Sequence, residues 1–148
     1  RIFDSFWAQF GWMNVRLDSY WYDVLLGVSL LSLLGLLHLG IRLAMRKERL
    51  EAWQAKVLAL YLVWTALVVV ITYVQYTAEF SVSSFPQGRY LFPALVPIAT
   101  YFALGLKSLL PRALQPALIV TLLAGLFLLD TLALGLTIVP FYYSGENG

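Results

Sequence analysis

The sequence feature that most constrains the fold is an apolar run at residues 57–78, which contains no charged side chain. A helix of this length covers about 30 Å, the thickness of the hydrocarbon core of a membrane, so the run predicts a membrane-spanning helix. Composition agrees, because charged residues make up 12% of the chain, against about a quarter in soluble domains.

Three further apolar runs predict three further spans, at residues 23–41, 90–110 and 116–140. The expected fold is therefore all-α: a polytopic membrane helix bundle of four transmembrane helices within residues 23–143. Residues 144–148 form a polar tail. Because the chain begins at Arg1 and shows no signal-peptide pattern, we expect it to be a piece of a longer protein.

Residues 1–22 are rich in aromatic side chains but are too often interrupted by polar residues to span. Phe3, Phe6, Trp7 and Phe10 fall near helical spacing, which predicts an interfacial amphipathic helix lying on the membrane surface, followed by a turn at residues 15–19. Two interpretations stay open: an ordinary aromatic belt at the membrane boundary, or one wall of a lipid-substrate site.

Basic residues predict the orientation of the spans. Seven of them fall in the two connections between the first and second spans and between the third and fourth: Arg42, Arg46, Lys47, Arg49, Lys56, Lys107 and Arg112. Three lie in the segments on the other side: Arg1, Arg16 and Arg89. The excess predicts that both ends of the chain are extracytoplasmic.

Several classes of function have no support in the sequence. There is no cysteine and only one histidine, so no metal site is expected, and no cofactor motif appears. A net charge of +2, dispersed along the chain, does not indicate nucleic-acid binding. The acidic residues form no paired set that would identify a catalytic base.

The most specific stretch joins the second and third spans and reads Ser84-Phe85-Pro86-Gln87-Gly88-Arg89-Tyr90-Leu91-Phe92-Pro93. It predicts a loop that enters a membrane helix directly, with Arg89 and Tyr90 at the headgroup level. An arginine beside a glycine suits an anionic headgroup, so Gln87, Gly88, Arg89 and Tyr90 are the candidate lipid-phosphate-binding residues. The alternative is that Arg89 only snorkels to phospholipid headgroups.

Two polar residues fall inside predicted spans. Asp130 lies well away from either end of the fourth span, where a carboxylate costs about 3 kcal/mol, so we expect it to face other helices and to find a hydrogen-bond partner. A structural and a functional role both stay open for it. His38, toward the far end of the first span, is expected to be packed or hydrogen-bonded rather than a ligand.

The stretch from Gln87 to Pro93, followed by an apolar helix that ends in Leu109-Leu110-Pro111-Arg112, resembles the C-terminal region of bacterial GT-C-type membrane proteins, the lipid-linked-sugar glycosyltransferases. The segment Ser5-Phe6-Trp7-Ala8-Gln9-Phe10-Gly11-Trp12 resembles the aromatic segment that precedes their last spans. The resemblance implies a multi-pass protein of the bacterial inner membrane that takes a sugar from a polyprenyl-phosphate carrier at the extracytoplasmic face. It also implies a catalytic acidic residue in a first outer loop, for which this chain offers no match.

Two functions from different classes therefore stay open. In the first, the chain is the C-terminal membrane portion of a glycosyltransferase-like protein, not catalytic by itself, with Arg89 holding the carrier phosphate. Alternatively, it is a non-catalytic accessory subunit of a larger membrane complex, such as an energy-converting one. In both cases its expected partners are membrane lipids and other transmembrane helices.

Overall fold

Four long helical segments make up most of the structure, a computed structural model that describes residues 2–10, 15–78 and 88–143. Within these residues, four segments are long and apolar enough to cross a membrane: Ser19–Ala44, Ala52–Gln75, Gly88–Leu109 and Gln115–Tyr143. This confirms the predicted all-α fold of four spans. In chain order the elements are α1 (Ile2–Ala8), β1 (Gln9–Phe10), β2 (Val15–Arg16), α2 (Ser19–Ala44), α3 (Ala52–Ala78), the 3₁₀ helix η1 (Gly88–Ala94), α4 (Leu95–Leu109), α5 (Gln115–Leu132), the π-helix η2 (Ala133–Ile138) and α6 (Val139–Tyr143).

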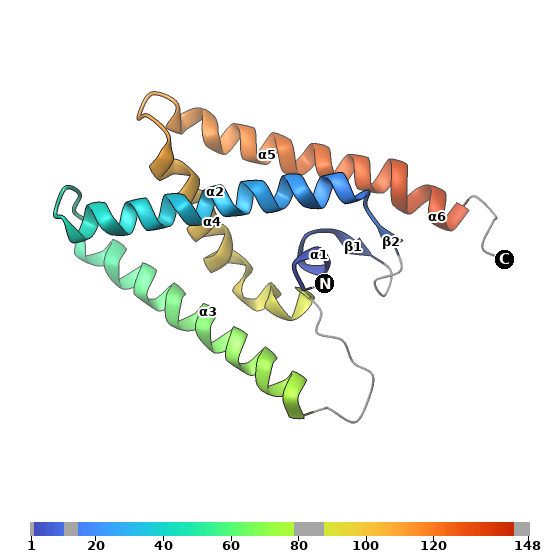
Figure 1. The fold of residues 1–148 in the computed structure, drawn as a ribbon, viewed down its shortest axis with the longest axis horizontal. Coiled ribbons are helices and arrows are strands. Elements are labelled where there is room, and N and C mark those ends of the chain that lie inside the picture. Colours follow the sequence, from blue (N-terminus) through green and yellow to red (C-terminus); the bar gives the residue numbers. More distant parts are fainter. Residues whose placement is uncertain (1, 11–14, 79–87, 144–148) are drawn as a thin grey trace.

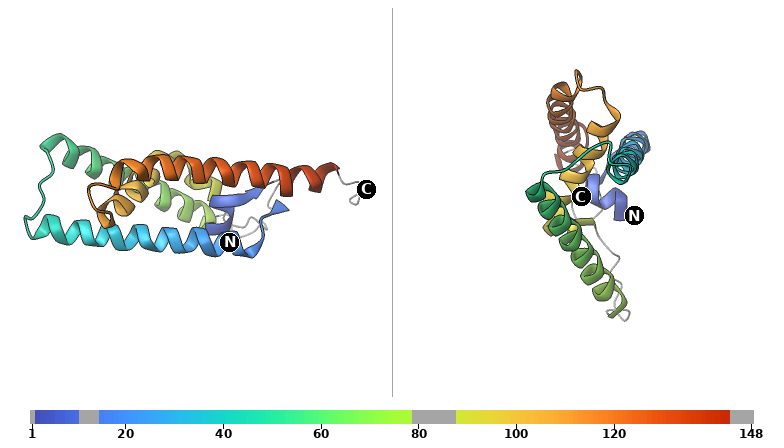
Figure 2. Two further views of the ribbon diagram at one scale, coloured as in Figure 1. Left: turned by 90° about the horizontal axis from the view of Figure 1, so that it is seen from above. Right: turned by 90° about the vertical axis from the view of Figure 1, so that its left-hand side faces the viewer.

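The long helices run between two ends of the molecule (Figure 1). One end carries α1, the β1–β2 pair and α6, and we call it the hairpin end. The other carries the connections at residues 45–51 and 110–114, and we call it the loop end. In Figure 1 the loop end is at the left, and Figure 2 shows the same separation from above.

The N-terminal segment folds differently from the prediction. Helix α1 is short, and the chain continues into an antiparallel pair in which Gln9 lies opposite Arg16 and Phe10 opposite Val15. The prediction of a turn at residues 15–19 was wrong, because Val15 and Arg16 are extended and α2 has already begun at Ser19. The helical spacing of aromatic residues in this segment indicated one continuous helix. In the structure the helix ends at Ala8, because the next residues pair with β2.

The spans begin earlier than the hydropathy pattern predicted. Helix α2 starts at Ser19 rather than at residue 23, so its first turn contains the aromatic residues that were assigned to the interface. Helix α3 starts at Ala52 rather than at residue 57. The reason is the same in both cases: a polar or charged residue limits how deep a helix lies in hydrocarbon, but it does not stop the backbone from being helical.

The closest packing in the molecule is between α2 and α4. Ser32 and Gly35 of α2 and Gly105 of α4 are buried, and a Cβ atom on Gly35 would lie only 1.9 Å from the carbonyl oxygen of Gly105. The Ser32 hydroxyl donates to the Phe102 carbonyl at 2.9 Å, and the Ser108 hydroxyl donates to the Gly35 carbonyl at 2.5 Å. Small residues thus bring two backbones into direct contact, as membrane helices do where no aqueous hydrophobic effect drives them together.

Helix α3 diverges from this pair toward its C-terminal end (Figure 1). Two side-chain hydrogen bonds attach it: the Trp64 indole N–H donates to the Pro93 carbonyl at 2.9 Å, and the Tyr101 hydroxyl donates to the Leu58 carbonyl at 2.5 Å. Most of its large apolar side chains are exposed, as a lipid-facing helix requires.

The fourth span docks on the hairpin end through a local change in helix geometry. In η2 the Val139 N–H donates to the Leu134 carbonyl, five residues earlier. Pro140 follows, and its ring would crowd the Leu136 carbonyl in an α-helix, which favours the wider π turn. At the start of this turn Ala133 is 2% exposed and packs in the core cluster with Leu17.

Candidate lipid-phosphate site

The beginning of the third span is held in place by the N-terminal helix. The Gly88 N–H donates to the Ser5 hydroxyl at 2.6 Å, in a bond that is buried and joins residues 83 positions apart. A Cβ atom on Gly88 would lie 2.2 Å from the Phe6 backbone nitrogen. Gly88, one of the candidate lipid-phosphate-binding residues, is therefore buried against α1 and is not open to a ligand.

Aromatic rings also pack between α1 and the third span. The Phe6 ring meets the Phe92 ring edge to face, with centroids 6.1 Å apart, and the Trp7 and Phe102 rings have centroids 5.7 Å apart. Such pairs add about 0.5–1.5 kcal/mol each beyond the burial of their surface. The aromatic N-terminal segment thus packs against the third span through Phe6 and Trp7.

Two prolines shape the entry of the third span. In a continuous α-helix the Pro93 carbonyl would accept from residue 97, but residue 97 is also a proline and has no N–H. The Trp64 indole supplies the donor from α3 instead. The spacing of the two prolines was visible in the sequence, and it is the signal that could have predicted a donor from another helix.

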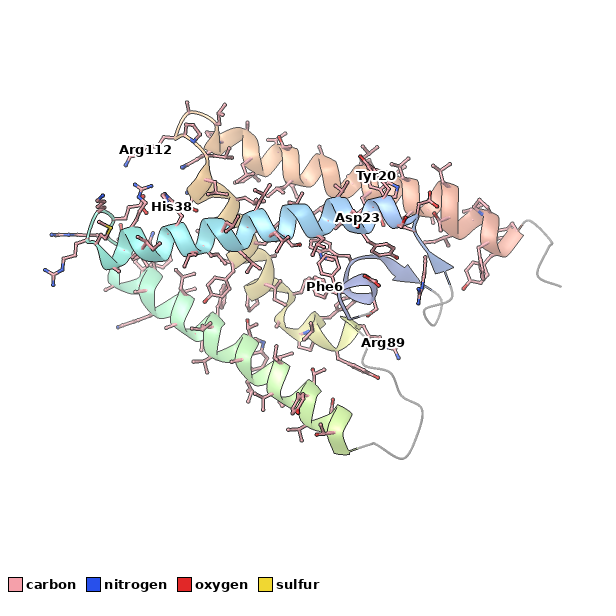
Figure 3. All side chains as sticks on the ribbon, in the orientation of Figure 1. Phe6, Tyr20, Asp23, His38, Arg89 and Arg112 are labelled. Atoms are coloured by element: carbon pink, nitrogen blue, oxygen red, sulfur yellow. The ribbon has the colours of Figure 1, made fainter. Side chains whose placement is uncertain are left out.

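Arg89 and Tyr90 follow the pinned glycine and are both exposed. The centre of the Arg89 guanidinium lies 5.7 Å from the centroid of the Tyr90 ring, within the range of a cation–π contact. In Figure 3 Arg89 extends from the first turn of η1, on the side away from α4. The structure therefore presents a cation at the end of a span, next to an aromatic ring, on a backbone fixed by α1.

The other predicted site residues are distributed as follows. Gln87 lies outside the described residues. His38 is exposed on α2 in the half toward the loop end, far from Arg89 (Figure 3). Asp130 is exposed on α5, and the hydroxyl of its neighbour Thr131 donates to the Phe127 carbonyl. The expectation that Asp130 faces another helix is not met by any helix in the described part of the chain.

Within the described residues, no three His, Cys, Asp or Glu side chains lie close enough together to hold a metal ion. Around Arg89 the fold offers an exposed guanidinium next to the Tyr90 ring, an arrangement suited to binding an anionic group.

Comparison with protein-family models, with curated protein sequences and with solved structures finds no match for this chain. The fold itself defines the class: a membrane-embedded, multi-pass helical protein.

Proposed function

We propose that this chain is the C-terminal membrane portion of a glycosyltransferase-like protein, and that it binds the phosphate of a polyprenyl-phosphate sugar carrier at its hairpin end. The observation that carries the proposal is Arg89, an exposed cation at the first turn of a span whose backbone is pinned by the bond between Gly88 and Ser5. The resemblance of residues 87–93 to GT-C-type proteins adds support.

The proposed role of Arg89 is to bind and orient the carrier. Its planar guanidinium donates two parallel hydrogen bonds to phosphate oxygens, a geometry that lysine cannot reproduce. The Tyr90 ring restricts the guanidinium, so less side-chain entropy is lost when the phosphate binds. In this proposal the catalytic acid comes from an outer loop elsewhere in the protein, and the hairpin end faces the extracytoplasmic side of a bacterial inner membrane, as the basic residues of the loop end favour.

Substitution of Arg89 by lysine tests this proposal in the full-length protein. We expect Arg89→Lys to weaken polyprenyl-phosphate binding about tenfold, or roughly 1.4 kcal/mol, while membrane insertion is unchanged. Native mass spectrometry with polyprenyl phosphate measures the occupancy. The matched control is Arg49→Lys at the loop end, which should leave occupancy unchanged.

Equal occupancy for the wild type and Arg89→Lys would overturn the proposal and leave Arg89 with snorkelling only. A parallel titration with phosphatidylglycerol separates a carrier site from a general affinity for anionic lipid. If phosphatidylglycerol loses binding in the variant by the same factor as polyprenyl phosphate, the site does not select the carrier.

A second candidate function is supported by Asp130. This carboxylate lies near the middle of the Gln115–Tyr143 span and is exposed, although a charge at that depth costs about 3 kcal/mol when it faces lipid. The observation favours a chain that is covered by helices from outside the described residues, as in an accessory subunit of a larger membrane complex.

The accessory-subunit proposal predicts that one substitution affects the native assembly but not the isolated chain. Asp130→Leu should leave the isolated chain as stable as the wild type, because it removes a charge from an exposed site. In the native assembly it should weaken association by about 1 kcal/mol, because a hydrogen bond between helices is lost, whereas Asp130→Asn should assemble nearly normally. Unchanged co-purification of native partners with Asp130→Leu would rule this role out.

A further inference from the structure

A cavity with polar and apolar lining residues lies at the hairpin end, and Arg89 is not part of its lining. Its volume is about 390 Å³, it is half-enclosed, and it is formed between the residues that precede α2 and the π-helical turn of the fourth span. Arg16, Asp18 and Thr137 contribute polar groups, while Leu132 and Leu136 provide an apolar wall. The lining thus combines polar groups with apolar side chains.

Extended backbone places a cation and a carboxylate together in this lining. Leu17 is 7% exposed and packs into the core cluster with Ala133. Its two neighbours, Arg16 and Asp18, are exposed and line the cavity, as alternation along an extended segment requires. Both charges therefore belong to a segment that is anchored between them by one buried side chain.

Aromatic side chains place the cavity at the depth of lipid headgroups. Trp21, in the first turn of α2, and Phe141 of α6 both line it. Tyr20 and Tyr142 neighbour them in sequence and are exposed (66% and 58%). Tryptophan and tyrosine gather where hydrocarbon meets water, so the polar part of the cavity lies among headgroups and the leucine wall is directed to acyl chains.

We propose that this cavity is a binding site for a phospholipid whose headgroup carries both a phosphate and a primary ammonium, such as phosphatidylethanolamine. Arg16 binds the phosphate, Asp18 binds the ammonium, and the first part of one acyl chain lies against Leu132 and Leu136. An anionic headgroup without an ammonium fits less well, because it offers no positive charge to pair with the Asp18 carboxylate. The volume is at the lower end of the range of small-molecule sites, about 300–1,000 Å³, which suits a headgroup and the start of one chain.

The site is distinct from the Arg89 site and does not depend on the polyprenyl-phosphate proposal. Competition among three lipids tests it: the full-length protein in mild detergent is incubated with equimolar phosphatidylethanolamine, phosphatidylcholine and phosphatidylglycerol, and bound lipid is measured by native mass spectrometry. We expect phosphatidylethanolamine to be retained most. Phosphatidylcholine is retained less, because its trimethylated nitrogen donates no hydrogen bond to Asp18. Equal retention of all three lipids would overturn the proposal.

Substitutions of Arg16 and Asp18 test whether the lipid binds in this cavity. Asp18→Asn should reduce the preference for phosphatidylethanolamine over phosphatidylglycerol about tenfold, because it removes the charge that binds the ammonium. Arg16→Gln should lower the retention of all three lipids. Asp18→Glu keeps the charge and should keep the preference, and Arg49→Gln at the loop end is the control. A preference that survives in Asp18→Asn would contradict the assignment, whatever its size in the wild type.

A soluble headgroup distinguishes a lipid site from a site for a free metabolite. Glycerophosphoethanolamine carries the same two charges but has no acyl chain to lie against the leucine wall. At a concentration equal to that of the lipid it should not displace bound phosphatidylethanolamine. Displacement under these conditions would show that the apolar wall contributes nothing, and it would overturn the proposal of a lipid site.

Discussion

Helices α2 and α3 are similar in length and apolar character, yet they pack in different ways. Helix α2 meets α4 backbone to backbone at Gly35 and Gly105. Helix α3 contacts η1 and α4 through side chains, which include the hydrogen bonds from Trp64 and to Leu58. Hydropathy decides only that a segment enters the membrane. The placement of small residues and of hydrogen-bond donors decides which helix a span packs against and how closely the two helices approach.

The same contrast separates the glycines of α2 itself. Gly35 is buried at the crossing with α4, while Gly27 and Gly40 have nothing within 4 Å of a built Cβ atom. The difference lies in the partner, because α4 offers Gly105 and Ser108 where Gly35 meets it. A glycine on a span therefore allows close helix packing only where the facing helix also carries small residues.

The largest expected effect is at the α2–α4 crossing. Gly35→Leu places a branched side chain where even a Cβ atom would meet the Gly105 backbone at 1.9 Å, so the helices must separate. We expect a loss of about 3 kcal/mol or more, at the upper end of overpacking costs, measured by thermal unfolding in detergent. Gly27→Leu is the matched control and should be nearly neutral. Equal melting temperatures for the two variants would refute the crossing.

A smaller effect is expected at the junction of α1 and η1. Gly88→Ala introduces a Cβ atom 2.2 Å from the Phe6 backbone nitrogen, so α1 must shift, and the cost should be about 1–3 kcal/mol. Hydrogen exchange of residues 2–8 reports the change, because these amides should exchange faster once α1 is displaced. Gly125→Ala, at an open position on α5, should leave exchange in α1 as it is. Unaltered protection of α1 in Gly88→Ala would mean that α1 does not dock on η1.

The smallest effect is expected where α3 is attached. Trp64→Phe keeps an aromatic ring but removes the N–H that reaches the Pro93 carbonyl, and we expect a loss of about 1 kcal/mol. Trp53→Phe is the control, since the Trp53 indole bonds to the exposed Glu51 at the loop end. Thermal unfolding of both variants in detergent makes the comparison. A larger loss for Trp53→Phe would show that α3 is held from the loop end.

Hydropathy predicted the four spans and their order, because the energetic cost of charges in hydrocarbon is a local property of sequence. The contacts between spans were not predictable in the same way. The sequence contains many small residues on α2, and nothing local distinguishes Ser32 and Gly35 from the others. At the site, Arg89 and Tyr90 stood out by composition, but the role of Gly88 depends on Ser5, which lies 83 residues away.

The charged residues that line the hairpin-end cavity were equally hard to predict from the sequence. In the sequence, Arg16 entered only the count of basic residues and Asp18 was one of the polar residues that interrupt an aromatic segment. A helical period was the stronger signal in that region. Their position beside η2 follows from the strand pair and from the burial of Leu17. Long-range packing, not periodicity, brought these residues to one place.

The packing comparison and both proposed lipid sites require that the chain crosses the membrane four times, with the hairpin end and the loop end on opposite faces. The chain has no cysteine, so single cysteines introduced at exposed positions give an unambiguous readout. Ser19→Cys and Tyr143→Cys report the hairpin end, and Ala52→Cys and Ala113→Cys report the loop end. In intact membrane vesicles, an impermeant maleimide should label the first pair from one side and the second pair only from the other. Labelling of Ser19→Cys and Ala52→Cys from the same side would contradict the four-span arrangement.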